Sequence, residues 1–571
     1  MAEKNNANIG FEEQLWKAAC VLWGHIPAAE YRKVIVGLIF LRYISSVFDK
    51  RYQELLAEGD GFENDPIAYL AENIFFVPEE ARWSKISESA HTPEIGKVID
   101  EAMLAIEREN KSLKGVLPKN YGSPDLDKRV LGEVVDLFTN NIKMDDTEES
   151  KDLLGRTYEY CIAQFAAYEG TKGGEFYTPS SIVKTLVEIL KPFENCRVYD
   201  PCCGSGGMFV QSVEFLKAHS GNRDRISVYG QESNSDTWKM AKMNMAIRGI
   251  DADFGPSHAD TFFNDVHPTL KADFIMANPP FNVDEVVYDK VKDDPRFKPY
   301  GVPKNKSKST KKDKDKKETV PNANYLWISY FATALNENGR SALVMANSAS
   351  DAGASELDIR TKMIKEGIIK QMVTLPSNMF TSVTLPATLW FFDKQKPNTD
   401  KKDEILFIDA RNVFTQVDRS HRKFSAEQIR NLGIITRLYE GETEEFTKLI
   451  NEYEANMANA PETSDEEDNP PKSYWQENIN WLKERFPEGK YRDVIGLCKV
   501  AKLEGEDGVK DQDYSLNPGR YVGVVIEDDG MTEDEFKEKI CSLEHEYLSL
   551  STECSELEQD IKDSLAGIFG D

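Results

Sequence analysis

The feature that most constrains the fold of this chain is an alternation of short apolar runs with helical stretches between about residue 150 and residue 420. The runs are rich in β-branched and aromatic residues. Strands that alternate with helices in this way are typical of βαβ units in a parallel sheet. We therefore predict a doubly wound α/β sheet with seven strands, at Arg197–Tyr199, Ile226–Gly230, Asp273–Ala277, Ala342–Met345, Gln371–Leu375, Thr388–Phe392 and Ile405–Ile408.

An all-α domain is predicted before this sheet, over residues 1–150. Apolar residues recur there every three or four positions, which is the spacing of one face of an α-helix. Three stripes carry the pattern: Phe11, Leu15, Ala18, Ala19 and Leu22; Leu38, Leu41, Ile44, Val47 and Phe48; and Val130, Leu131, Val134, Val135 and Phe138.

A helical tail is predicted at the other end of the chain. The acidic, proline-containing segment 460–473 indicates a linker or surface loop. Further on, apolar residues step by three and four, at Phe536, Ile540, Leu543, Tyr547, Leu550, Cys554, Leu557 and Ile561. This spacing predicts a long amphipathic helix that packs on another helix, in this chain or in a partner. We thus divide the chain into a helical domain (1–150), a sheet domain (151–470) and a C-terminal segment (471–571) ending in a partner-docking helix.

Composition limits the class of protein. The longest apolar run, Val34–Leu41, has eight residues, whereas a bilayer-spanning helix needs roughly 20. The first residues do not resemble a signal peptide, so we expect a cytoplasmic protein without a membrane span. The eight cysteines show no paired C-x-x-C spacing. This argues against a zinc site or a disulfide framework, and we expect reduced thiols and no metal.

The charge of the chain also restricts its partners. With 70 basic and 98 acidic residues the net charge is −28, the wrong sign for a protein that binds duplex DNA alone by neutralising phosphates. One segment runs against this balance, because Lys304–Lys317 holds eight lysines and two aspartates. We expect an exposed, mobile loop at about residues 302–320. A DNA-contacting arm is the alternative.

A glycine-rich turn follows the first predicted strand. Asp200 ends that strand, and Gly204, Ser205 and Gly206 lead into an apolar helix start. Glycines let a backbone turn tightly and approach a ligand, and the helix N-terminus adds N–H donors. The spacing differs from the G-x-G-x-x-G of dinucleotide-binding folds. We predict a pocket for another nucleotide-type ligand.

An acidic residue, Glu232, comes just after the second predicted strand. A carboxylate at this position of a doubly wound fold can accept hydrogen bonds from the ribose hydroxyls of an adenosine-containing ligand. The alternative is an ordinary solvated acid at a strand end. Its position after the glycine turn favours the binding role.

The third predicted strand leads into Asn278-Pro279-Pro280-Phe281 at the carboxyl edge of the sheet, where ligands bind in open α/β folds. Two prolines make the loop rigid, with its carbonyl groups pointing outward. The Asn278 side-chain oxygen and the Pro279 carbonyl can accept both hydrogens of a planar amino group, which frees its lone pair for methylation, while Phe281 stacks on the ring. A base must leave the duplex to reach such a loop. A surface turn is the alternative.

These motifs resemble those of S-adenosylmethionine-dependent amino-methyltransferases. Asp200–Gly207 is similar to motif I, Glu232 to motif II, Asp260 to motif III and Asn278–Phe281 to motif IV. Upstream, Gly173–Pro179 resembles motif X, and the order X, I, IV is that of the γ class of adenine methyltransferases. Four segments extend the resemblance, over nearly the whole chain, to the modification subunit of type I restriction-modification systems: Phe11–Gly24, Gly173–Leu190, Ala346–Arg360 and Asp513–Gly523.

The resemblance implies a Rossmann-like methyltransferase sheet that transfers a methyl group from S-adenosyl-L-methionine to N6 of a flipped-out adenine in DNA. It implies that the cofactor is bound by Glu175, Phe176, Tyr177, Thr178, Pro179, Ser180, Asp200, Gly204, Ser205, Gly206, Glu232 and Asp260. It also implies a complex of two modification subunits with one specificity subunit, joined by a restriction or motor subunit, that holds double-stranded DNA. Phe281 departs from the tyrosine often found in motif IV, which keeps stacking but loses a hydroxyl.

Three alternatives stay open on the residues alone. An N-P-P loop also suits methylation of a glutamine side-chain amide in a protein, or of the cytosine amino group. A non-catalytic scaffold is the third possibility, and the intact Asn278 and Glu232 argue against it.

Overall fold

The structure is a computed structural model that describes residues 28–141, 160, 178–220, 226–284, 286–304, 318–380, 386–419, 421–464, 469–525 and 533–569. The chain forms two compact units, Met1–Val522 and Gly523–Asp571. Within the described ranges, no helix combines the length and the apolar character needed to cross a bilayer.

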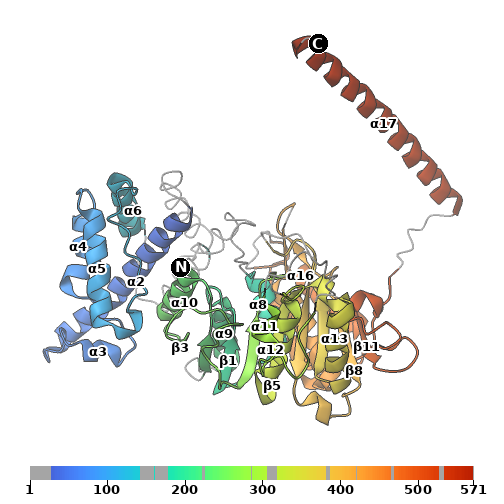
Figure 1. The fold of residues 1–571 in the computed structure, drawn as a ribbon, viewed down its shortest axis with the longest axis horizontal. Coiled ribbons are helices and arrows are strands. Elements are labelled where there is room, and N and C mark those ends of the chain that lie inside the picture. The colour runs from blue at the N-terminus through green and yellow to red at the C-terminus, as the bar shows by residue number, and fades with distance from the viewer. Residues whose placement is uncertain are drawn as a thin grey trace. The chain divides into compact units, whose positions relative to one another are not determined.

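The described part of the predicted N-terminal domain is helical (Figure 1, blue). The stripe from Leu38 to Phe48 lies on the long helix α2 and that from Val130 to Phe138 lies on α6, and both are buried in one core apart from the partly buried Val47. The stripe that begins at Phe11 lies outside the described residues. The helices are α2 (Ala28–Glu58), α3 (Pro66–Leu70), α4 (Trp83–Glu88), α5 (Ile95–Glu109) and α6 (Lys128–Asn141), with 3₁₀ turns η1 (Glu79–Ala81) and η2 (Lys111–Leu113).

A nine-stranded sheet forms the centre of the first unit, with strand order β11-β8-β6-β7-β5-β4-β1-β2-β3. All seven predicted strands are present, and the α/β fold class is confirmed. The strands are β1 (Cys196–Asp200), β2 (Ile226–Gly230), β3 (Ala252–Asp253), β4 (Ala272–Ala277), β5 (Leu335–Ala346), β6 (Ile369–Thr374), β7 (Ala387–Asp393), β8 (Glu404–Asp409) and β11 (Cys498–Lys502). A separate hairpin pairs β9 (Thr415–Gln416) with β10 (Arg422–Lys423).

Two strands depart from the predicted parallel arrangement. β7 is antiparallel to both of its neighbours, β5 and β6, and β11 is antiparallel to β8 at the sheet edge. Pro376 and Pro386 bracket a β6–β7 connection without helical spacing, so the chain returns directly instead of crossing over. β11 draws residues from beyond position 470 into this sheet. The division of the chain at residues 150 and 470 stays a prediction.

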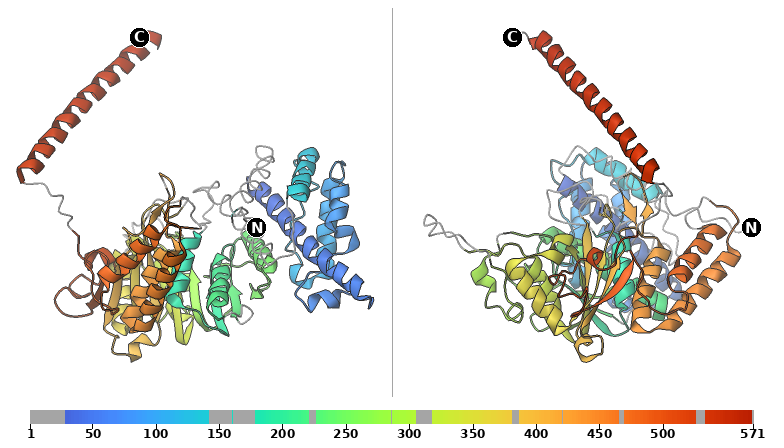
Figure 2. Two further views of the ribbon diagram at one scale, coloured as in Figure 1. Left: turned by 180° about the vertical axis from the view of Figure 1, so that it is seen from behind. Right: turned by 90° about the vertical axis from the view of Figure 1, so that its right-hand side faces the viewer.

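Helices cover both faces of the sheet, as the side view in Figure 2 shows. Successive residues of β4 alternate between two cores: Phe274 and Met276 pack in one, Ile275 and Ala277 in the other. The first core also contains residues of α8 (Ser180–Leu190), α9 (Gly207–Ser220), α10 (Ser235–Ile247), α14 (Ala426–Glu440), α15 (Thr443–Asn459) and α16 (Lys472–Arg485). The second contains residues of α12 (Asn324–Thr333) and α13 (Ala354–Glu366). The described residues of this unit also form the short helix α11 (Tyr288–Val291) and the 3₁₀ turns η4 (Asn347–Asp351), η5 (Lys396–Asn398) and η6 (Pro518–Arg520).

The second unit contains the predicted C-terminal helix, α17 (Glu533–Phe569). Its apolar seam, which we define as Phe536, Ile540, Leu543, Tyr547, Leu550, Leu557 and Ile561, is 48–69% exposed. The prediction of one long helix in this region is confirmed, and its packing on another helix stays a prediction.

Candidate active site

The carboxyl ends of three adjacent strands bring the predicted site residues to one edge of the sheet. β1 lies between β2 and β4 and is parallel to both. From β1 the chain continues to β2 and β3 on one side of β1, and then crosses to β4 on the other side. The strand order thus reverses at β1, and open α/β sheets bind ligands at such a topological switch point. Asp200, Glu232 and Asn278 all stand at or just beyond these strand ends.

The glycine turn after β1 is held by hydrogen bonds from neighbouring elements. Gly204 and Gly206 have φ values of +53° and +85°, which a residue with a side chain adopts only under strain. Asn244 on α10 donates from Nδ2 to the Ser205 carbonyl at 2.8 Å, and the Cys203 N–H donates to the Gln231 carbonyl at 2.9 Å. A Cβ at Gly204 would have no described atom within 4 Å. The turn therefore presents its backbone to open space.

The Asp200 carboxyl lies buried under this turn, 2% exposed, and accepts a hydrogen bond from the Cys202 N–H at 2.9 Å. Burial raises the pKa of Asp200 to about 8. Burial also raises the pKa of the Cys202 and Cys203 thiols well above the usual value, so neither is suited to be a nucleophile. These three side chains therefore have a structural role in the glycine turn.

Glu232 lies beside the glycine turn. Its carboxylate accepts hydrogen bonds from the Gly204 N–H at 3.1 Å and from the Asn234 N–H at 2.8 Å. Its backbone carbonyl accepts one from the Ala259 N–H at 2.8 Å, which brings the exposed Asp260 next to it. The sequence-predicted motifs I, II and III are thus neighbours in space.

The motif X residues are only partly described. Thr178 and Pro179 are half-buried and the exposed Ser180 begins α8. Glu175, Phe176 and Tyr177 lie outside the described residues, and their predicted contact with the cofactor stays a prediction. Residues 305–317, which are most of the predicted Lys-rich loop, also lie outside the described residues.

The predicted catalytic loop leaves the end of β4. Pro279 is buried, and Phe281 is half-buried and packs against both cores of the sheet. The Asn278 side-chain oxygen and nitrogen are both buried, and neither has a hydrogen-bond partner among the described residues. Burying an unpaired polar atom costs about 1–3 kcal/mol. An amide held in this way is complementary to a ligand that supplies both a donor and an acceptor.

Asn324, which was not predicted as a site residue, holds this loop in place through Asn282. Asn282, directly after the loop, has a left-handed φ of +54°. The buried Asn324 at the start of α12 accepts a hydrogen bond from the Asn282 N–H and donates one to the Asn282 side-chain oxygen, both at 2.8 Å. The Ala323 N–H donates to the Val283 carbonyl at 2.9 Å. Asn322-Ala323-Asn324 directly before an apolar helix is a helix-start signal that could have drawn attention to this position.

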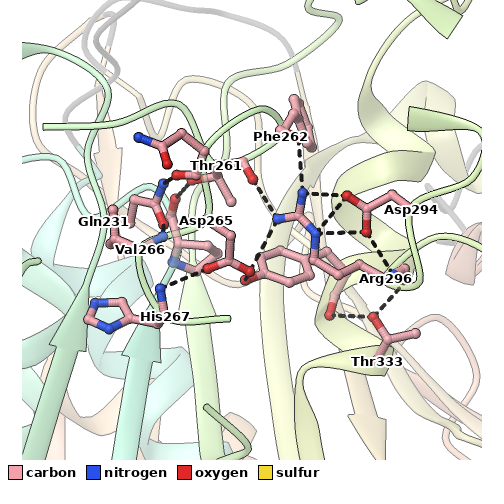
Figure 3. Close-up of polar contacts among 12 residues, drawn as sticks. Gln231, Thr261, Phe262, Asp265, Val266, His267, Asp294, Arg296 and Thr333 are labelled. Carbon is pink, nitrogen blue, oxygen red and sulfur yellow. Dashed lines mark hydrogen bonds and ion pairs between the residues drawn. The ribbon is translucent and has the colours of Figure 1, made fainter. Parts of the chain in front are cut away.

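A second missed residue, Arg296, ties motif III to the segment after the catalytic loop (Figure 3). Its guanidinium donates to the carbonyl groups of Thr261, at 2.5 Å, and Phe262, at 2.9 Å, and forms a two-pronged pair with Asp294. Thr261 in turn donates from its hydroxyl to the Pro201 carbonyl of the glycine turn. Arg296 therefore ties the backbone that follows Asp260 to the segment Asp294–Arg296.

The chain matches two protein-family models. The N-6 DNA methylase model matches residues 149–469, and the HsdM N-terminal domain model matches residues 11–138. The chain is 32% identical to the type I restriction enzyme MjaIX methylase subunit of Methanocaldococcus jannaschii, covering 97% of this chain and 91% of that protein. It is 36% identical to the HindI methylase subunit of Haemophilus influenzae, covering 86% and 99%.

Solved structures agree in fold. The type I restriction-modification methyltransferase subunit from Streptococcus thermophilus superposes with a TM-score of 0.66 at 20% identity, over 90% of this chain and 99% of that one. A modification subunit of a putative type I restriction enzyme from Vibrio vulnificus gives 0.52 at 16% identity, over 86% and 92%.

The chain therefore belongs to the N-6 DNA methylase family, as a methylase subunit of the type I restriction-modification class. The predictions of the family, the fold class and an adenine N6 methyltransferase activity are confirmed. The roles assigned to individual site residues stay predictions.

Two of the four segments that carried the family resemblance meet away from the catalytic loop. Asp351, from Ala346–Arg360, accepts hydrogen bonds from the hydroxyl of Ser515 and from Asn517 Nδ2, and Arg360 donates to the Tyr514 carbonyl at 2.7 Å. These contacts join the tail segment Asp513–Gly523 to the sheet domain. In these two segments the contacts support packing.

Proposed function

We propose that this subunit methylates N6 of a flipped-out adenine at the Asn278–Phe281 loop, using S-adenosyl-L-methionine held at the glycine turn. The observation that carries this proposal is the buried Asn278 amide, which lacks a partner among the described residues at the switch point of the sheet. The site fits the cofactor because Gly204 faces open space beside the Glu232 carboxylate. The sulfonium of the bound cofactor supplies an activated methyl group.

The chain's own residues position the adenine and polarise its amino group. The Asn278 Oδ1 and the Pro279 carbonyl oxygen each accept a hydrogen bond from the N6 amino group. These two hydrogen bonds draw the nitrogen lone pair out of conjugation with the ring. That lone pair would form the new N–C bond as the S–C bond of the cofactor breaks, so that S-adenosyl-L-homocysteine leaves, and the extra proton on N6 would pass to solvent. Phe281 stacks on the base. Catalysis arises from orientation and from hydrogen bonds that strengthen as positive charge develops on N6.

The cofactor residues divide by role in this proposal. The Glu232 carboxylate accepts hydrogen bonds from the ribose hydroxyls. Gly204 to Gly206 approach the methionine portion of the cofactor, and Asp260 lies near its adenine ring. Asp200 supports the turn from below. Residues Glu175 to Ser180 close over the methionine end.

Analysis of the methylated product tests the reaction. The subunit is purified with its specificity subunit, incubated with plasmid DNA and radiolabelled S-adenosyl-L-methionine, and the DNA is digested to nucleosides. We expect the label in N6-methyladenine. Label in N4-methylcytosine, or in protein, would overturn the proposal.

We also propose that the subunit acts in a complex, two copies to one specificity subunit, with a restriction or motor subunit joining for cleavage, in the cytoplasm. The net charge of −28 supports delegation of DNA reading to a partner. The exposed apolar seam of α17 is suited to partner docking. Because α17 has eleven acidic and three basic residues, a basic helix of a partner suits it better than a second copy of itself.

Disruption of the seam tests this docking. Leu543→Asp with Leu550→Asp should abolish co-purification with the specificity subunit, whereas Ser549→Asp, on the same turn but off the seam, should not. Binding of S-adenosyl-L-methionine by the isolated subunit should be the same in the wild type and in both variants. Intact co-purification of the double variant would contradict the docking role.

A further inference from the structure

A small basic hairpin lies at the same edge of the sheet as the catalytic loop. The segment Arg411–Lys423 contains four arginines and lysines and one acidic residue, Asp418. It includes strands β9 and β10, which pair Gln416 with Arg422 and Thr415 with Lys423. The segment therefore has an excess of positive charge in a chain whose net charge is −28.

Topology fixes the side of the sheet on which this hairpin emerges. β8 ends at Asp409 and is parallel to β6; β6 and β5 both pair antiparallel with β7; and β5 is parallel to β4. The carboxyl ends of β4 and β8 therefore share one edge. Four strand spacings separate them, which at about 4.8 Å each is roughly 19 Å.

The hairpin is fastened to this edge by Arg422. Its N–H donates to the Asn378 carbonyl at 2.9 Å, and its Nη1 donates to the Ser377 hydroxyl at 3.2 Å, both in the loop after β6. Its guanidinium lies 3.9 Å from the centre of the Phe414 ring, and its Nε donates to Gln416 Oε1 at 3.2 Å. These contacts involve neutral partners, so the positive charge of Arg422 is kept while its position is fixed.

The other charged residues of the segment differ in their partners and in their exposure. The acidic Asp418 contacts His421 Nδ1 at 2.7 Å. Arg411 forks onto the buried Asp409 and so contributes little net charge. Arg419 is exposed at the tip, and Lys423 is half-buried at the base. Apart from Arg411, the segment therefore has three basic residues, Arg419, Arg422 and Lys423, and one acidic residue, Asp418.

We propose that the β9–β10 hairpin contacts phosphates of duplex DNA beside the flipped adenine. This inference rests on the proposed function, because it needs DNA to enter at Asn278. A separation of roughly 19 Å corresponds to about half a helical turn of B-DNA, so the hairpin meets the backbone a few nucleotides from the target base. Phosphate contacts of this kind position the duplex without reading its sequence.

The salt dependence of DNA binding tests the hairpin directly. The subunit is assembled with its specificity subunit, and affinity for a fluorescent duplex of arbitrary sequence, about three helical turns long, is measured over a range of salt concentrations. Arg419→Gln with Lys423→Gln should weaken binding at low salt by about tenfold. The slope of log affinity against log salt should decrease by about 2, since each phosphate contact contributes about 0.9.

Two comparisons make the test specific. Lys394→Gln with Lys402→Gln removes two charges near the opposite edge of the sheet, after β7 and before β8, and should leave the slope unchanged. The single variant Arg419→Glu, at an exposed tip residue, should weaken binding without lowering the unfolding temperature. Cofactor affinity should be equal in all proteins.

The outcomes separate the two proposals. An unchanged salt slope in the Arg419 and Lys423 variant would overturn the hairpin contact, and so would loss of the specificity subunit from that variant, since the hairpin would then be a protein interface. Failure of the wild-type complex to form N6-methyladenine would instead overturn the proposed function, and the binding measurement does not depend on that reaction.

Discussion

Asn324 and Asn282 exchange two hydrogen bonds, each 2.8 Å long, directly after the proposed catalytic loop Asn278–Phe281. Asn282 is held at a left-handed φ of +54° by this pair, and its neighbour Phe281 packs between two cores of the sheet. The direction in which Asn278 to Phe281 point is therefore set by a residue 42 positions away from Asn282 in the chain.

Loss of this pair should slow methyl transfer. Asn324→Ala removes both hydrogen bonds, and we expect the single-turnover rate to fall by about 10- to 100-fold because the loop is no longer fixed. Cofactor affinity should not change. Asn398→Ala, an exposed asparagine at the opposite edge of the sheet, should retain the wild-type rate. An equal rate in Asn324→Ala would show that the pair does not orient the loop.

Removal of the Glu232 carboxylate should weaken cofactor binding. Charge-assisted hydrogen bonds are worth about 1.5–3 kcal/mol, so Glu232→Ala should raise the dissociation constant for S-adenosyl-L-methionine by about 10- to 100-fold in calorimetry. Glu214→Ala, an exposed position on the helix after the glycine turn, serves as the control. Equal affinity in Glu232→Ala would contradict the ribose role.

Asp200 should make stability depend on pH. Burial raises the pKa of Asp200 to about 8, whereas an aspartate in the unfolded chain has a pKa of about 3.9. The folded protein therefore holds a proton that the unfolded chain has lost. The contribution to the free energy of unfolding falls as the pH rises from about 4 to about 8, by up to about 1.4 kcal/mol per pH unit.

Asp200→Asn cannot titrate and keeps the oxygen that accepts the Cys202 N–H. Between about pH 6 and about pH 8, the unfolding temperature of the wild type should therefore drop more than that of the variant. Thermal unfolding of both proteins at the two pH values measures this. A parallel drop in both would mean that the Asp200 carboxyl is already ionised at the lower pH.

Arg296 should support both stability and cofactor binding. Arg296→Met leaves the Asp294 carboxylate without its pair and frees the Thr261 and Phe262 carbonyls, and we expect a loss of about 2 kcal/mol or more. Cofactor affinity should fall by about 3- to 10-fold because the segment carrying Asp260 loosens. Arg129→Met breaks one exposed pair with Glu133 and should lower stability by less than about 1 kcal/mol. Similar losses in both variants would contradict the linking role of Arg296.

Much of this fold and part of the site follow from local sequence patterns. The seven predicted strands have alternating or continuous apolar residues bounded by turns, and the seam of α17 has regular helical spacing, so both could be predicted. The glycine turn, Glu232 and Asn278 could be placed because each directly follows a strand, and strand ends of a parallel sheet meet at one edge.

What could not be predicted depends on contacts between residues far apart in the chain. The segment Cys498–Lys502 is short and interrupted by lysines, so it has no clear strand pattern of its own, and it forms β11 because it pairs with β8. Asn324 and Arg296 act on loops that lie 42 and 35 positions away, and no local spacing reports such contacts. The antiparallel direction of β7 likewise follows from pairing within the sheet.

The central claim is that the buried Asn278 amide accepts a hydrogen bond from the adenine amino group. Asn278→Ala tests it most directly, in the complex with the specificity subunit, by single-turnover methyl transfer measured beside calorimetric binding of S-adenosyl-L-methionine. We predict a rate at least about 100-fold lower, as for the loss of one preorganised transition-state hydrogen bond, with unchanged cofactor affinity. A variant that binds the cofactor and methylates adenine at the wild-type rate would contradict the account.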